Sequence, residues 1–383
     1  MAGLGDWKTI PTGAMSSMVG DQVETRAKLS ALRASMFGAD VDAVYLEGYA
    51  NVAWLCGGRG NRVVIDSPTG LCGILVGANG AWLLAPNNEE ARLRAEVFAD
   101  LPLPLVARPW YQLPLWQAAR PLLPQAARWL ADVAVPGAGD AEPMLADLRR
   151  ALSEADAQRY RSLGVDTAEA LETALLEVRA GWSELEVAGA MAAALMARDI
   201  EPSVMLVGTR ARAERFRHLV PTRAVVDGGL IASTTAVRHG LHASVTRCIS
   251  FGSVPGELVE KHATVVQVDT AYLAKCRPGA TLGQAFAAGE RSFAANGFYE
   301  DWKEHHQGGT TGYAGREVFA QPGVELALGA GVAVAWNPTV PGAKSEDTFL
   351  IGDHGLEQLT MAPRSPWPSS GGDIPRLGIL VVD

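Results

Sequence analysis

The sequence predicts a two-domain α+β protein, and three observations lead to this prediction. The chain has 383 residues, which is more than a single hydrophobic core usually organises. Short apolar segments separated by turns fill residues 41–86, and a helix-like segment follows them. Beyond residue 150, long amphipathic segments come first and short strand-like segments follow. We therefore expect residues 1–150 to form a small α/β domain and residues 151–383 to form a larger α+β domain.

The predicted first domain starts with strand-like segments and continues with a helix. The five segments lie at residues 41–48, 51–58, 62–66, 72–77 and 81–86. Residues 87–100 then predict a helix, because Asn88 suits the N-cap position and acidic residues occupy the first turn. Strands that alternate with helices favour an α/β arrangement.

The predicted second domain combines long helices with a curved, mainly antiparallel sheet. Good helix formers fill residues 142–181 and 182–200, and Ser183 is placed to cap the second of these helices. Helical segments at 262–276 and 282–297 lie among the later strands. The predicted strands are residues 203–208, 230–240, 242–252, 331–338 and 346–352.

Composition and charge exclude several classes of function. A formal net charge of −9, with no run of five Lys or Arg, argues against binding to nucleic acid. The chain shows no secretory signal and no apolar run of the roughly 18 residues that a membrane helix needs. Four scattered cysteines without paired spacing are typical of reduced, mostly buried thiols, so we expect a cytoplasmic protein; they are Cys56, Cys72, Cys248 and Cys276.

Five motifs occur in an order that is similar to the creatinase / aminopeptidase P / methionine aminopeptidase superfamily. They lie at residues 51–58, 82–96, 177–191, 242–252 and 345–360. The resemblance covers nearly the whole chain. It implies a creatinase-like N-terminal domain, a C-terminal domain with the pita-bread fold (a curved sheet covered by helices), and a homodimer.

The resemblance also implies that the ligands of the superfamily's two metal ions are largely lost. Metallopeptidases of this superfamily use two Asp, one His and two Glu, a set suited to hard divalent cations. The matching positions here are Ser233, Ser244, Gly309, Asn337 and Glu346, so only the last ligand survives. We therefore expect neither a dinuclear metal site nor another cofactor. Ser233 and Ser244 either bind substrate or only leave space where the metals would lie.

Several polar residues remain at positions that the resemblance associates with substrate and catalysis. His218 matches a histidine that contacts the substrate, and His305 lies four residues before the lost histidine ligand. Arg316 and Glu317 replace a usual His-Glu pair, and Arg316 is one candidate to compensate the charge of Glu346. The other predicted substrate-binding residues are Arg59, Arg62, His239, His242, Ser233, Ser244, Tyr313 and Asn337. We expect His262 and His354 at the surface.

The resemblance to creatinase implies that this fold can cleave a C–N bond without a metal. Imidazole can accept and return a proton near neutral pH, so His218 is the predicted general acid and base, assisted by Glu346 and His305. The predicted function is a hydrolase or lyase, not a peptidase, acting on a small amidino, amide or cyclic carboxylate. Two alternatives stay open: a binding protein without catalysis, and an Xaa-Pro-type metallopeptidase whose ligands have relocated.

Overall fold

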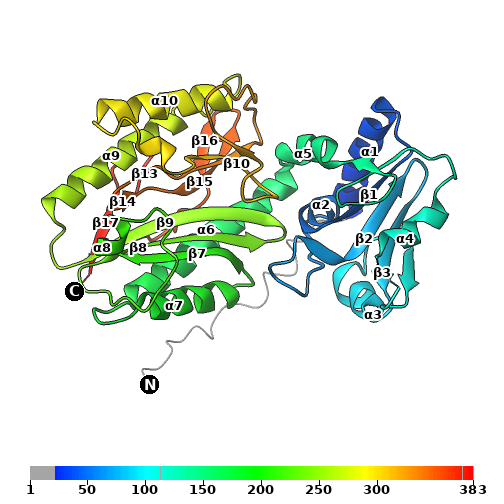
Figure 1. Cartoon of the computed structure of the whole chain (residues 1–383), viewed down its shortest axis with the longest axis horizontal. Coiled ribbons are helices and arrows are strands. Elements are labelled where there is room, and N and C mark those ends of the chain that lie inside the picture. Colours follow the sequence, from blue (N-terminus) through cyan, green and yellow to red (C-terminus); the bar gives the residue numbers. More distant parts are fainter. Residues whose placement is uncertain (1–21, 113, 373, 383) are drawn as a thin grey trace. The chain divides into compact units, whose positions relative to one another are not determined.

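The computed structural model describes residues 22–112, 114–372 and 374–382 (Figure 1). The described residues form two compact units. Of the described residues, one unit contains those from Gln22 to Arg159 together with His239–Leu241, and the other contains Tyr160–Arg238 and those from His242 onward. The helix α6 (Glu154–Leu176) carries the chain from one unit into the other. The predicted two-domain α+β architecture is confirmed, whereas the boundary at residue 150 stays a prediction.

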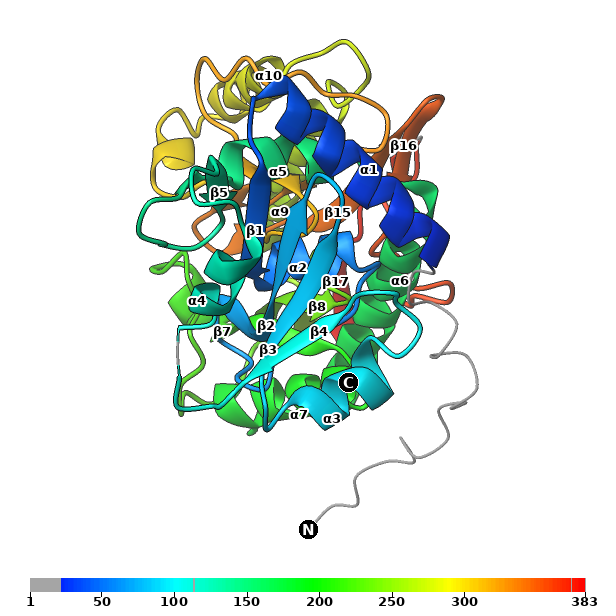
Figure 2. The ribbon, with the colours of Figure 1, turned by 90° about the vertical axis from the view of Figure 1, so that its right-hand side faces the viewer.

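The N-terminal unit is built on a mixed six-stranded sheet with the order β4-β3-β2-β1-β5-β6. Antiparallel pairing joins β1 to β2 and β2 to β3, and parallel pairing joins β3 to β4, β1 to β5 and β5 to β6. Figure 2 looks onto β1, β2 and β3, which lie side by side. The strands are β1 (Ala43–Gly48), β2 (Thr69–Gly77), β3 (Ala81–Pro86), β4 (Leu105–Arg108), β5 (Trp129–Ala131) and β6 (Gly139–Asp140).

The helices of this unit are mostly short. Its core packs Tyr45, Leu75 and Leu84 of the sheet against Ala119 of α4. The helices are α1 (Gln22–Gly38), α2 (Tyr49–Leu55), α3 (Glu90–Arg92), the π-helix η1 (Leu93–Val97), α4 (Trp116–Ala119), the 3-10 helix η2 (Arg120–Leu122) and α5 (Glu142–Arg150).

Two of the strands predicted in this unit are absent from the structure. Residues 51–58 fall largely within the helix α2, which is buried along almost its whole length. A short apolar run fits a buried helix as well as a buried strand, so periodicity could not separate them. Residues 62–66 form no strand, and their side chains Val63, Val64 and Ile65 are exposed. β-branched residues favour a strand only where a neighbouring strand or a core covers them.

The C-terminal unit contains two main sheets and four long helices. One sheet has the order β17-β9-β8-β7 and the other has the order β11-β10-β12-β15-β16, while β13 and β14 form a separate pair. The strands are β7 (Glu201–Thr209), β8 (Leu230–Arg238), β9 (Leu241–Phe251), β10 (Gly308–Thr311), β11 (Val318–Phe319), β12 (Ala333–Trp336), β13 (Thr339–Val340), β14 (Ala343–Lys344), β15 (Asp347–Gly352), β16 (Gly355–Gln358) and β17 (Ile379–Val382).

The helices of the C-terminal unit pack against these sheets. Besides most of α6, they are α7 (Glu184–Met196), α8 (Arg210–Ala213), α9 (Gly256–Leu273), α10 (Leu282–Ala295) and the 3-10 helix η3 (Asp301–Lys303). Ser183 caps α7 as predicted, in a capping box with Glu186. α9 and α10 lie side by side (Figure 1) and share a core with β12 and β15. In this core, Trp336 stacks on Tyr272 with ring centroids 4.1 Å apart.

A tight turn of two residues joins β8 to β9. His239 and Gly240 both have positive φ, at 56° and 78°, as a two-residue type I′ turn requires.

Among the described residues, no helix has the length and apolarity that crossing a lipid bilayer requires. The four cysteines are buried thiols without disulfide partners.

Candidate active site

The C-terminal unit contains a cavity of about 270 Å³ whose lining includes several charged and polar side chains. β7 and β8 line one part of it, and the segments around β10, β11 and β14 line the rest. The lining residues are Ser203, Val204, Leu206, His218, Ser233, Thr234, Thr235, His242, His305, His306, Gly315, Arg316, Phe319, Asn337, Lys344 and Glu346. Most side chains that the sequence analysis assigned to the site are therefore in this cavity, including all three predicted catalytic residues.

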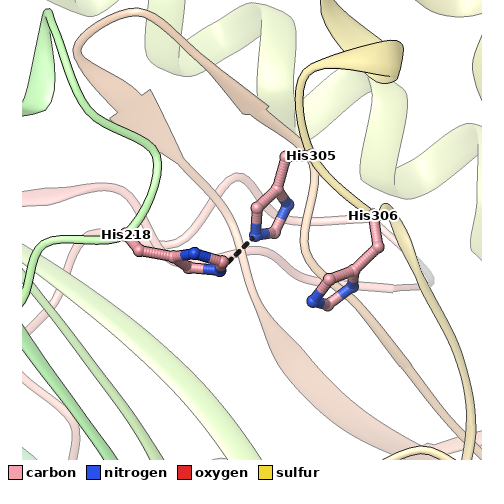
Figure 3. A group of neighbouring side chains, drawn as sticks. All are labelled: His218, His305 and His306. Atoms are coloured by element: carbon pink, nitrogen blue, oxygen red, sulfur yellow. Dashed lines mark hydrogen bonds between the residues drawn. The ribbon is translucent and has the colours of Figure 1, made fainter.

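Three histidines gather in the cavity. The Nε2 atoms of His218 and His305 lie 3.2 Å apart, and the rings of His305 and His306 stack with centroids 4.4 Å apart (Figure 3). His218 lies in the loop after α8, whereas the other two precede β10. Burial, assisted by Lys344, lowers the pKa of His305 to about 3, and burial with Arg316 lowers that of His306 to about 4. Both imidazoles are therefore neutral near pH 7.

Glu346 is buried between two cations. Lys344 Nζ lies 2.7 Å from its Oε2 atom, and Arg316 Nη2 lies 3.6 Å from its Oε1 atom. Thr246 also donates its hydroxyl to Oε2 at 2.8 Å. Burial by itself would raise the pKa of Glu346, but the charges of Lys344 and Arg316 hold that pKa below the ordinary glutamate value. The carboxylate is thus ionised, and the cavity lining carries one more positive than negative charge.

The five positions of the superfamily's metal ligands do not fit two divalent cations. The ammonium of Lys344 binds Glu346 and also lies 3.3 Å from Ser233 Oγ, so a cation of the chain already contacts two of these positions. Ser244 is fully buried, and its hydroxyl lies 2.9 Å from that of Thr235. These contacts leave the set with a single carboxylate that is already neutralised.

Gly309 cannot be replaced by a ligand side chain at its present backbone position. Its φ is 152°, and a Cβ atom placed there would lie 2.0 Å from the carbonyl oxygen of Val318. β10 and β11 pair at this point, with Gly309 opposite Phe319. The close approach of the two strands therefore requires glycine where the superfamily has a histidine.

Some predicted substrate-binding residues lie among the cavity-lining residues and others do not. His242, Ser233, Arg316 and Asn337 line the cavity, and the buried Oδ1 atom of Asn337 has no hydrogen-bond partner among the described residues. Ser244, Tyr313 and Glu317 are not among its lining residues. Tyr313 is fully buried, while Glu317 accepts a hydrogen bond from the Ala314 amide at 3.1 Å.

Arg59, Arg62 and His239 belong to the N-terminal unit and make contacts within it. Arg59 is buried and pairs with Asp100 at 2.7 Å, and the Arg62 guanidinium lies over the ring of Tyr49, 3.7 Å from its centroid. Nδ1 of His239 lies 3.3 Å from the Gly58 carbonyl oxygen. Their role in substrate binding stays a prediction.

Among the ionisable residues of the cavity lining, sequence reasoning missed two, Lys344 and His306. Lys344 precedes Glu346 by two positions, and alternate residues of an extended segment face the same way, so this spacing was the available signal. His306 follows His305 directly, and no periodicity predicts that both rings turn into one cavity. His262 was predicted at the surface but is buried in α9, whereas His354 is exposed as predicted.

Comparisons with known proteins identify the family and the fold. The model of Metallopeptidase family M24 matches residues 158–353, and that of the Creatinase/Prolidase N-terminal domain matches residues 28–175. These matches confirm the superfamily resemblance. The uncharacterized peptidase YqhT of Bacillus subtilis (strain 168) is 24% identical over 209 residues. That match covers 51% of this chain and 58% of the relative.

Solved structures share the fold over most of the chain. The prolidase from Pyrococcus horikoshii OT3 has a TM-score of 0.74 at 18% identity, covering 88% of this chain and 99% of that chain. Dipeptidase PepE from Mycobacterium ulcerans has a TM-score of 0.73 at 19% identity, covering 95% and 100%.

The comparisons overturn the functional prediction made from the sequence. The matched family is one of metallopeptidases, and the related proteins are named as peptidases, prolidases and dipeptidases. The prediction of a metal-independent, creatinase-like hydrolase or lyase outside the peptidases is therefore wrong. Its error was to infer the reaction from the positions of the metal ligands alone.

Proposed function

The chain belongs to metallopeptidase family M24, and from this premise we propose that it is a peptidase that hydrolyses dipeptides and other very short peptides. The Xaa-Pro dipeptidase from Bacillus anthracis shares its fold, with a TM-score of 0.70, at 16% identity and over 89% of this chain and 98% of that chain. Xaa-Pro dipeptides are therefore the first substrates to test.

The observation that carries this proposal is the charge distribution of the cavity. Arg316 and Lys344 are the cations of the lining, and Glu346 is its carboxylate. Glu346 neutralises one cation, so the cavity favours a ligand with one anionic group. The C-terminal carboxylate of a short peptide supplies such a group, and the planar guanidinium of Arg316 matches it in shape. A volume of about 270 Å³ suits a ligand of this size better than a folded protein chain.

The reaction requires one water molecule and the transfer of protons. The water oxygen adds to the peptide carbonyl carbon, the C–N bond breaks, and the leaving nitrogen receives a proton. His218, His305 and His306 occupy the part of the cavity that lies beside Arg316 and Glu346, where the water would be activated. The catalytic roles predicted for His218, His305 and Glu346 remain part of this proposal, as do a cytoplasmic location and a homodimer.

The test is hydrolysis of a dipeptide panel by the purified full chain. The protein would be supplied in turn with Mn²⁺, Co²⁺ and Zn²⁺, and the released amino acids would be quantified by mass spectrometry. We expect turnover of dipeptides with a free carboxylate and a strong loss for their C-terminal amides. Binding without hydrolysis of any dipeptide, under all three metals, would show a ligand-binding protein and end the proposal.

A substitution at Arg316 examines the proposed contact with the substrate carboxylate. Arg316→Lys keeps the charge but loses the paired donors, so KM for free dipeptides should rise on the order of tenfold or more. The matched control is Arg161→Lys, because Arg161 pairs with Glu357 at the exposed face of the same unit. An unchanged KM in Arg316→Lys would contradict the proposed contact.

A further inference from the structure

The three histidines of the cavity form a group that the mechanism above does not fully explain. Within residues 22–112, 114–372 and 374–382, they are the only group of three or more His, Cys, Asp or Glu side chains placed to hold a metal ion. Each offers one nitrogen, and the three nitrogens lie within 4.8 Å of one another. We propose that His218, His305 and His306 bind a single divalent transition-metal ion of the zinc type.

The spacing of the nitrogens matches the size of such a site. Zinc–nitrogen bonds of about 2.0–2.1 Å place the ligands of a tetrahedral ion about 3.3 Å apart. The Nε2 atoms of His218 and His305 are already 3.2 Å apart. His306 must approach by up to about 1.5 Å to complete the site. Its side chain is partly exposed and lies in the segment before β10, so rotation of the ring requires no change in the core.

The surroundings of His305 direct its ring toward the centre of the group. Its Nδ1 atom is buried without a hydrogen-bond partner in the described part of the chain, whereas its Nε2 atom faces His218 (Figure 3). At this separation only one of the two Nε2 atoms can carry the proton of a hydrogen bond between them. A metal ion would use the lone pairs of both Nε2 atoms and would replace one shared hydrogen bond by two metal–nitrogen bonds. With the ion bound, His218 and His305 would act as ligands and no longer as proton carriers.

This site differs in position and chemistry from the two-metal site of the superfamily. The superfamily's set is mainly carboxylate, which suits hard cations, whereas three imidazoles suit zinc, copper, cobalt or nickel. Lys344 already binds Glu346 and Ser233, so the old position is filled by an ammonium group. An ion held by three imidazoles keeps a fourth position for water and lowers the pKa of that water toward 7.

Charge near the group does not prevent the binding of a cation. Lys344 and Arg316 lie in the same cavity as the histidines, but both are paired with Glu346. The carboxylate therefore screens part of their repulsion. The remaining positive charge favours an anion beside the metal, such as hydroxide or the carboxylate of the proposed substrate.

Direct metal binding tests the inference without reliance on activity. The untagged full chain, freed of metal with a chelator, would be titrated with Co²⁺ and with Zn²⁺ by calorimetry. We expect one equivalent of each, and the Co²⁺ form should show the intense visible absorption of a four-coordinate ion. No binding, or binding of two equivalents with the weak absorption of six-coordinate Co²⁺, would overturn the inference.

Substitutions of the two exposed histidines locate the ion. His218→Gln and His306→Gln should each weaken Co²⁺ binding by more than the roughly 10–100-fold that loss of an outer-shell partner causes. The matched control, His354→Gln, alters an exposed histidine in the turn between β15 and β16 and should bind as the unaltered chain does. Equal binding by all three variants would place the ion elsewhere and refute the site.

The site and the proposed peptidase function can fail separately. Metal binding with no hydrolysis of any dipeptide would retain the three-histidine site and end the peptidase proposal. Hydrolysis of a dipeptide by a chain that binds neither Co²⁺ nor Zn²⁺ would retain the peptidase proposal and end the three-histidine site.

Discussion

Replacement of Glu346 by glutamine should destabilise the C-terminal unit strongly, although the two side chains have nearly the same shape. The carboxylate lies 2.7 Å from Lys344 Nζ and 3.6 Å from Arg316 Nη2. All three side chains are at most 10% exposed. Glu346→Gln therefore leaves two largely buried cations without their counter-ion, which is the situation in which loss of one partner of a buried pair costs most.

The magnitude follows from these distances. At an effective dielectric constant of about 20, the two attractions amount to about 6 and about 5 kcal/mol. Most of this gain is offset because burial of the carboxylate costs several kcal/mol of hydration energy. We expect a net loss of about 3–5 kcal/mol in the free energy of unfolding. For a unit of this size, that corresponds to a fall in melting temperature on the order of 10 °C.

Calorimetric melting of the purified variants measures this loss. Glu357→Gln is the matched control, because Glu357 pairs with Arg161 at 2.8 Å in an exposed position, where an ion pair contributes less than about 1 kcal/mol. The double variant Glu346→Gln/Lys344→Met removes one of the two isolated cations and should be more stable than Glu346→Gln alone. A loss in Glu346→Gln no larger than that of Glu357→Gln would refute the reasoning.

Two further predictions concern Gly309, where β10 pairs closely with β11, and the buried His262. Gly309→Ala should lower the free energy of unfolding by about 3 kcal/mol or more, because its Cβ atom would lie 2.0 Å from the carbonyl oxygen of Val318. The control Gly189→Ala in α7 has open space around the new Cβ atom and should stabilise the protein by about 0.5–1 kcal/mol. Equal melting temperatures of the two variants would contradict this prediction. Burial and the charge of Arg376 lower the pKa of His262 to about 4 in the folded protein. On acidification the histidine is therefore protonated in the unfolded chain, near pH 6.5, before it is protonated in the folded protein. The free energy of unfolding should fall as the pH drops below 6.5, by about 2 kcal/mol at pH 5. His262→Gln should remove that part of the pH dependence in urea unfolding at pH 7 and pH 5, and a variant with the same dependence as the unaltered chain would show that His262 does not cause it.

Much of the fold was predictable because its determinants are local or periodic. Ser183 caps α7 because a hydroxyl before a helix can accept from its third amide, a preference that acts within four residues. The long helices and the strands β8 and β9 follow from period and composition in the same way. Residues 51–58 and 62–66 were predicted wrongly because their apolar runs are short, and burial by distant segments decides what such runs become.

The candidate site was predicted less completely, because its chemistry depends on which charged side chains lie next to one another in the folded chain. Motif order identified His218, His305 and Glu346, and the structure brings all three into one cavity. Motifs did not identify the main partner of Glu346. Arg316 was one candidate named from the sequence, but Lys344 makes the shorter contact.

The sequence by itself determined the superfamily and the α+β architecture, because both depend on residue type and order along the chain; the loss of four metal-ligand positions stays a prediction from the resemblance. Only the tertiary structure decided which other side chains meet Glu346 and the histidines. Lys344 reaches Glu346 and Ser233, and His306 joins two histidines from separate loops, through backbone paths that no local pattern encodes. Electrostatic contacts act through space, so the residues that carry the chemistry here became clear only once the chain had brought them within a few ångströms.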